Sequence, residues 1–163
     1  MTNDEVLRDQ LLQLLRGGNA HMSLDQAVVD FPPGSMNSYP QDVSYTPWHL
    51  LEHIRLSQRD ILDFIENPDY EWLPFPEGYW PKQSEQADQK RWNTTLQGIK
   101  DDLGALERII ENPDTDLYSD LPHAKGYNIL REVLIVADHN AYHIGEFGIL
   151  RQIMGTWPEN RTG

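Results

Sequence analysis

The chain has 163 residues, no cysteine and a formal net charge of −13 at pH 7. The lack of cysteine excludes a disulfide framework, a thiolate metal site and a cysteine nucleophile. The acidic balance argues against DNA or RNA as a partner, because neutralising phosphates requires a basic surface. The first residues are acidic and no apolar run approaches the length of a membrane span, so we expect a cytoplasmic protein with no membrane partner. The length predicts one domain over residues 1–163.

The N-terminal part is predicted to hold one long helix, over residues 4–16. Its leucines recur at spacings of three and four, the pattern of an amphipathic helix, and a glycine pair follows as a C-cap. His21 lies in the linker, where we expect an ordinary surface or capping residue. Ser23 is then predicted to cap a short helical turn over residues 24–29.

The second long helix is predicted over residues 46–66. Thr46 is its expected N-cap, and Pro47 takes the first helical position, where proline is favoured. On a helical wheel His53 lies at the edge of the apolar arc, so we expect its side chain to point into the protein. His49 lies further round, on the polar side, where we expect it to face water or to form the rim of a site.

The middle of the chain contains two predicted loops and a third long helix. Residues 69–83 are rich in aromatic residues and proline, which indicates a rigid loop packed over one end of the helices, either as a pocket wall or lid or as a structural cover. The third helix is predicted over residues 85–111, with the narrow apolar stripe of bundle packing. Residues 114–127 are predicted to form a loop, in which we expect His123 to be exposed to solvent; the alternative is that it approaches the site from the loop.

The last helix, predicted over residues 128–155, is apolar on nearly every side. Such a helix is buried on more than one side, either because it is central or because a second subunit covers it. Four of its polar residues project in nearly the same direction: Glu132, His139, His143 and Glu146. Buried polar groups need partners or a metal, so this strip is a candidate site.

His139 and His143 lie four residues apart, which places both imidazoles on one face of a helix. Two neutral imidazoles in this arrangement can chelate one divalent metal. The spacing alone leaves a second interpretation open, in which both histidines are satisfied within a core. A zincin motif is excluded, since Asn140 stands where glutamate is required. The four long helices, with no repeat or linker between them, predict an all-α four-helix bundle.

Two parts of the chain resemble the metal-binding helices of the DinB/YfiT-like superfamily. The first is Trp48–Ile54, with the sequence WHLLEHI, and the second combines Leu130–Glu132 with Ala137–Gly145, ADHNAYHIG. The resemblance extends over nearly the whole chain, including the order of the helices. It implies a four-helix bundle of that type, commonly a homodimer, with one metal-binding histidine on the second long helix and two on the last.

Carried onto this chain, the resemblance implies that His53, His139 and His143 hold the metal. The helical wheel favours His53 independently. The family usually has glutamine where this chain has Glu146, an acid that would tune the metal, act as a catalytic base or simply be a solvated variant. Glu132 and His49 are further candidates for an assisting role.

Three histidines leave a coordination position open, which is the arrangement of a catalytic rather than a structural metal. The resemblance implies a divalent transition metal (Zn, Ni, Mn or Fe), a small-molecule substrate and a low-molecular-weight thiol as co-substrate, because characterised members of the family include thiol-dependent S-transferases and metal hydrolases. The expected activity is therefore that of a thiol S-transferase or a small-molecule hydrolase. The alternative is a non-catalytic, stress-related bundle that binds a metal or ligand, or serves as a dimeric scaffold.

Overall fold

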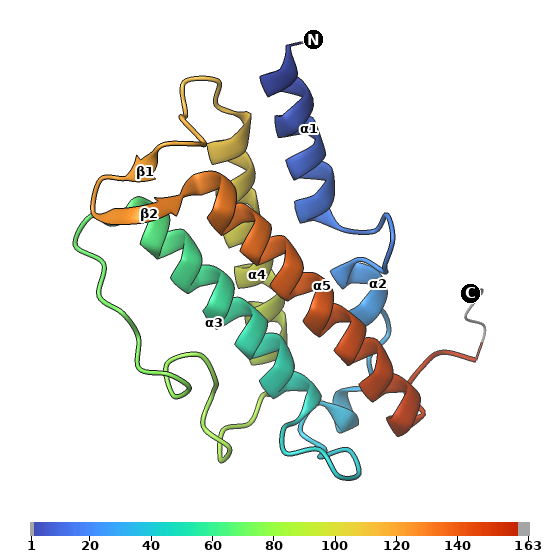
Figure 1. Ribbon diagram of the computed structural model, residues 1–163. Coiled ribbons are helices and arrows are strands. Elements are labelled where there is room, and N and C mark those ends of the chain that lie inside the picture. Colours follow the sequence, from blue (N-terminus) through green and yellow to red (C-terminus); the bar gives the residue numbers. More distant parts are fainter. Residues whose placement is uncertain (1, 160–163) are drawn as a thin grey trace.

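A computed structural model describes residues 2–159 of the chain as a mostly helical structure with one small sheet (Figure 1). The elements are α1 Asn3–Arg16, α2 Leu24–Val28, the 3-10 turn η1 Pro33–Ser35, α3 Pro47–Glu66, α4 Gln89–Glu111, β1 Asp120–Leu121, β2 Ala124–Asn128 and α5 Ile129–Met154. The all-α prediction is therefore confirmed at the level of fold class. Within residues 2–159 no helix is both long enough and apolar enough to cross a membrane.

The four long helices pack side by side. Helix α3 packs against α4 and α5, and α1 packs against the same two helices (Figure 1). Residues 67–88 run back along α3 before α4 begins, so α3 and α4 point in the same direction while α1 and α5 point the opposite way. Two clusters of buried side chains fill the space between the helices, one containing Trp48 and Phe147 and the other containing Leu62 and Val136.

The helix starts follow the capping residues. The predicted caps Ser23 and Thr46 are confirmed, since each side chain accepts a hydrogen bond from the backbone N–H three residues later. The third long helix begins at Gln89 rather than at residue 85, so its predicted start is wrong. Both backbone groups of Ala87 are bonded to the amide side chain of Asn37, at 2.8 and 2.9 Å, and this pairing holds the chain extended up to the start of α4.

Residues 120–128 form a short antiparallel hairpin where a loop was predicted. Strand β1 has two residues and β2 lacks the apolar alternation of a strand, so no sequence pattern indicated the pairing. His123, expected in solvent, lies in the turn and is half-buried. Its Nε2 lies 2.9 Å from the Phe64 carbonyl oxygen, which ties the hairpin to the end of α3.

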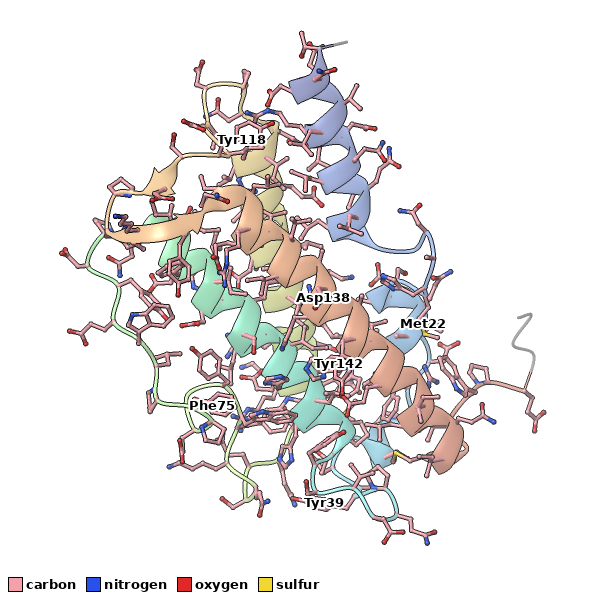
Figure 2. The ribbon with its side chains drawn as sticks, in the orientation of Figure 1. Met22, Tyr39, Phe75, Tyr118, Asp138 and Tyr142 are labelled. Atoms are coloured by element: carbon pink, nitrogen blue, oxygen red, sulfur yellow. The ribbon has the colours of Figure 1, made fainter. Side chains whose placement is uncertain are left out.

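Helix α5 is buried on one face and exposed on the other. Its inner face contributes Val136, His143 and Phe147 to the interior. Its outer face leaves large apolar side chains exposed, including Tyr142 and Ile149. Figure 2 shows Asp138 and Tyr142 along this outer side. The chain itself therefore covers only one side of the apolar helix.

Candidate metal centre

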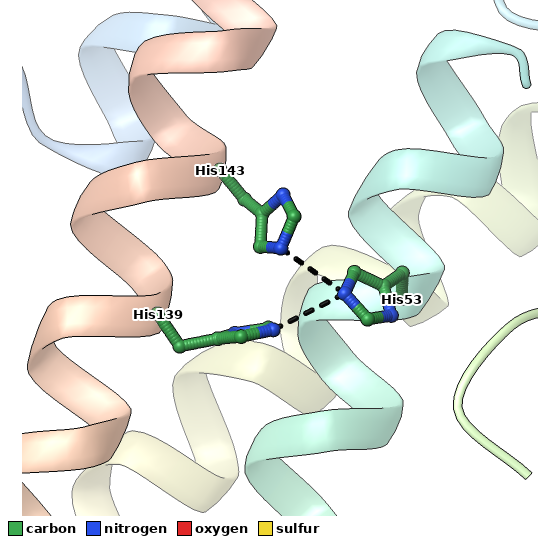
Figure 3. A group of neighbouring side chains, drawn as sticks. All are labelled: His53, His139 and His143. Atoms are coloured by element: carbon green, nitrogen blue, oxygen red, sulfur yellow. Dashed lines mark hydrogen bonds between the residues drawn. The ribbon is translucent and has the colours of Figure 1, made fainter. Parts of the chain in front are cut away.

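Three histidines from two helices converge at one point (Figure 3). His53 projects from α3 toward His139 and His143 on α5. The Nε2 atom of His53 lies 3.1 Å from Nε2 of His143 and 3.1 Å from Nε2 of His139. One ligand atom from each ring falls within a common span of 4.8 Å. The sequence prediction that these three side chains come together is thus confirmed.

The two separations that involve His53 suit a single metal ion. Two nitrogens that bind one zinc ion at about 2.0–2.1 Å lie roughly 3 Å apart at tetrahedral or octahedral angles, close to the 3.1 Å separations here. His53 and His143 are buried, and His139 is half-buried.

The hydrogen bonds of the other ring nitrogens determine the tautomers of two histidines. Nδ1 of His53 lies 2.7 Å from the Tyr79 carbonyl oxygen, which only accepts, so this nitrogen carries the proton and donates. Nδ1 of His143 donates in the same way to a carboxylate oxygen of Glu146 at 2.6 Å. In the neutral rings both Nε2 atoms then present lone pairs to each other at 3.1 Å. A cation or a shared proton between the two nitrogens relieves the repulsion of facing lone pairs, and a metal ion bound by both imidazoles is such a cation.

The local environment favours the neutral rings of His53 and His139, as metal binding requires. Burial lowers the pKa of His53, and the neighbouring His143 lowers it further, against the opposing effect of the Tyr79 carbonyl. Burial, followed by the nearby charges of His143 and His53, lowers the pKa of His139 to about 4. Neither ring therefore competes for protons at neutral pH.

Glu146 lies behind His143 rather than facing the other two histidines. One carboxylate oxygen accepts from Nδ1 of His143, and the other accepts from the hydroxyl of Tyr45. Burial acts to raise the pKa of Glu146, but the hydrogen bonds from His143 and Tyr45 outweigh it, so the net pKa lies below the ordinary value. The acid is therefore a charged partner that orients one ligand, as carboxylates commonly do behind metal-bound histidines.

Two further contacts hold His53 in place. The indole of Trp80 stacks on its ring, with the centroids 3.9 Å apart and the planes 4° from parallel. The hydroxyl of Ser57 lies 3.4 Å from Nδ1 of the ring. Tyr45, Tyr79 and Trp80 were not predicted as site residues, because they come from loops where no periodicity indicates which side chain turns inward.

His49 and Glu132 lie outside the cluster. His49, expected at a rim or in water, is buried, which corrects that prediction. Its ring accepts from the Thr46 N–H at the start of α3, and its Nε2 lies 2.9 Å from the carbonyl oxygen of Glu85, so residues preceding α4 cover it. Glu132 is buried and paired with Arg131. The helical wheel correctly placed His49 on the polar side of α3. It could not show that the residues before α4 fold over that side and bury the ring.

A cavity of about 370 Å³ adjoins the cluster. His53 and His139 line one part of it, and Glu132 and Arg131 line another. The cavity gives a small molecule a place beside two of the three proposed ligands.

The metal-free protein should lose stability as the pH falls from about 6.5 toward about 4. The pKa of His139 is lowered from 6.5 to about 4, so in this window the unfolded chain binds a proton that the folded chain excludes. This contribution to stability is complete above the unfolded pKa and is lost as pH falls through the folded one. Thermal unfolding of chelator-treated protein across this range should give a steeper pH dependence than the His139→Asn variant shows. An equal pH dependence of stability in the parent protein and in His139→Asn would contradict the lowered pKa of His139.

Comparison of the chain with protein-family models, with curated proteins and with solved structures finds no match.

Proposed function

We propose that the chain is a divalent-metal-binding protein of the DinB/YfiT-like type, a four-helix bundle whose metal is held by His53, His139 and His143. The observation that carries the proposal is the convergence of three imidazole nitrogens, since Nε2 of His139 and Nε2 of His143 each lie 3.1 Å from Nε2 of His53. The order and packing of the long helices and the two segments that resemble the family's metal-binding helices also support it.

We further propose a metal-dependent enzyme, either a thiol S-transferase that uses a low-molecular-weight thiol or a small-molecule hydrolase. A metal held by three histidines and open at another position would lower the pKa of a bound thiol or water near neutral pH. His53 and His139 border the cavity, so a small molecule placed there would lie beside two of the three proposed ligands. Glu146 holds the His143 ring in the ligating tautomer, and Trp80 holds the plane of the His53 ring.

A non-catalytic, stress-related metal- or ligand-binding bundle is the alternative. The position of Glu146 favours this alternative. Its two carboxylate oxygens accept hydrogen bonds from His143 and Tyr45, and the residue does not line the cavity. This alternative needs no proton-transfer group beside the metal.

Turnover separates the two candidate functions. Protein loaded with Zn, Ni, Mn or Fe is assayed with a panel of thiol acceptors and activated esters. The enzyme proposal expects turnover that is lost in the His139→Ala variant and retained in His21→Ala, whose ring lies outside the cluster and contacts the Met22 carbonyl. Unchanged turnover in His139→Ala would refute a role for the centre, and metal binding without turnover across the panel would favour the alternative.

We also propose a homodimer that covers the outer face of α5. Leu134, Tyr142, Ile149 and Ile153 are exposed apolar side chains along this helix, with the exposed Asp138 beside them, and a monomer rarely leaves so many large apolar side chains uncovered on one helix. Light scattering after gel filtration should give the dimer mass for the parent protein and the monomer mass for Ile149→Asp. Val6→Asp, an equivalent change on the exposed side of α1, should remain dimeric. A monomeric parent protein would refute the proposal.

A further inference from the structure

The cavity beside the histidine cluster is built largely from aromatic rings. Phe64 on α3, Tyr70, Trp72 and Tyr79 in the following loop, and Tyr127 on β2 all line it. These rings come from three separate segments and meet at the same end of α3. The lining beside the histidines therefore continues into a largely aromatic surface.

The rings support one another. Phe64 lies edge-on to Tyr70 and to Tyr127, with centroids 5.0 and 5.4 Å apart. Trp72 in turn lies edge-on to Tyr70, with centroids 5.4 Å apart. Mutual edge contacts of this kind hold rings in defined orientations, so the cavity is shaped before a ligand enters.

Two of the lining aromatic side chains remain largely uncovered. Trp72 is 66% exposed and Phe75 is 83% exposed. Figure 2 shows Phe75 on the segment that runs beside α3. Large apolar side chains that both line a cavity and face water gain stability when a ligand with an apolar surface covers them.

The charged residues of the lining already have partners. Asp60 accepts a hydrogen bond from the Tyr70 hydroxyl at 2.7 Å, and Glu132 is paired with Arg131. The guanidinium of Arg131 also lies over the Tyr127 ring, 4.7 Å from its centroid. An added ligand charge would have to compete with these pairs, whereas an uncharged body would not.

We propose that this cavity selects small molecules with an uncharged aromatic body, whose thiol or oxygen atom reaches the metal beside His53 and His139. The inference rests on the proposed metal centre for the position of that donor atom, but the aromatic selectivity comes from the cavity walls. The volume of about 370 Å³ lies within the range of small-molecule pockets, about 300–1,000 Å³.

The test compares two thiols that differ in their bodies. Cobalt-loaded protein is titrated with 2-phenylethanethiol and with 2-mercaptoethanol, following the cobalt absorption spectrum. We expect 2-phenylethanethiol to bind at least about tenfold more tightly, since burial of one aromatic ring contributes more than the equivalent of that factor. In parallel, the metal-free protein is titrated with 2-phenylethanol and followed by tryptophan emission, which should change as Trp72 is covered.

Two variants test the walls without touching the histidines. Ile135→Trp places a larger side chain in the lining and should abolish the preference for the aromatic thiol, whereas Leu14→Trp, on the exposed side of α1, should retain it. Trp72→Ala alters a largely exposed position, so folding is preserved, and should weaken binding of 2-phenylethanethiol about fivefold.

The outcomes separate the two proposals. Cobalt binding with equal affinity for both thiols, or a preference that survives in Ile135→Trp, would overturn the aromatic selectivity and leave the metal centre intact. No cobalt uptake would overturn the metal centre. The 2-phenylethanol titration of the metal-free protein would then decide the cavity proposal alone, with saturable binding lost in Ile135→Trp supporting it and no binding overturning it.

Discussion

Replacing His139 with alanine should remove the bound metal. Protein purified without chelator should contain about one equivalent of a transition metal, and the His53→Ala and His139→Ala variants should each lose it. Removing a ligand should weaken affinity at least roughly hundredfold, because changes to residues behind the ligands alone commonly cost about 10–100-fold. Metal content by inductively coupled plasma mass spectrometry, followed by competition with a chromogenic chelator, measures both quantities.

Glu146→Gln provides a graded comparison in the same experiment. The amide still offers an oxygen to Nδ1 of His143 but lacks the negative charge that strengthens this bond. Stoichiometry should be retained while affinity falls by about 10–100-fold. If His139→Ala keeps a full equivalent of tightly bound metal, the proposed centre is wrong.

Metal removal should also be visible in unfolding. A ligand present at about 1,000 times its dissociation constant stabilises the folded state by about 4 kcal/mol. For a chain of this size that corresponds to a melting temperature roughly 10 °C higher. This shift should be present in the parent protein on adding metal and lost in His139→Ala.

Replacing Arg151 with leucine should lower the free energy of unfolding by about 3–5 kcal/mol. The guanidinium is fully buried and donates to the backbone carbonyls of Ala27, Val29 and Thr156, at 2.6–2.8 Å. It also lies over the Trp157 ring. Leucine would fill much of the space but would leave buried carbonyl oxygens without their donor, and chemical denaturation measures the loss.

Arg16→Leu is the matched control. Arg16 forms an ion pair with Glu107 on α4 through two hydrogen bonds, but it is half-exposed. Such surface pairs contribute about 1 kcal/mol or less. If Arg151→Leu lowers the free energy of unfolding no more than Arg16→Leu does, the buried guanidinium does not make the expected contribution to stability.

The long helices and the pairing of His139 with His143 could be predicted from the sequence, because each follows from the local periodicity of a helix. His139 and His143 are four residues apart on a continuous helix, so their common face follows from helix geometry. His53 required a further inference from the apolar arc of α3, and the structure places it opposite the other two.

The contacts that complete the site depend on the loops, and periodicity does not predict them. His49 was expected at a rim, but the residues before α4 fold over it, and that segment is fixed by Asn37, 50 positions from its partner Ala87. The tautomer of His53 likewise depends on Tyr79. The sequence predicted that the aromatic loop containing Tyr79 packs over the helices, but it did not predict which of its groups contacts His53. Contacts between positions so far apart in the chain leave no local pattern.

The partners of two histidines differ in how easily a single mutation can change them. The Nδ1 proton of His53 is accepted by the main-chain carbonyl oxygen of residue 79, which any amino acid at that position would supply. The donor proton on His143 is accepted by the side chain of Glu146, which one substitution can neutralise, shorten or remove. During divergence of such a protein, the hydrogen bond that orients His53 would be kept. The basicity of His143 would change with the residue at position 146. Position 146 is therefore where the affinity of the centre can be altered without rebuilding the fold.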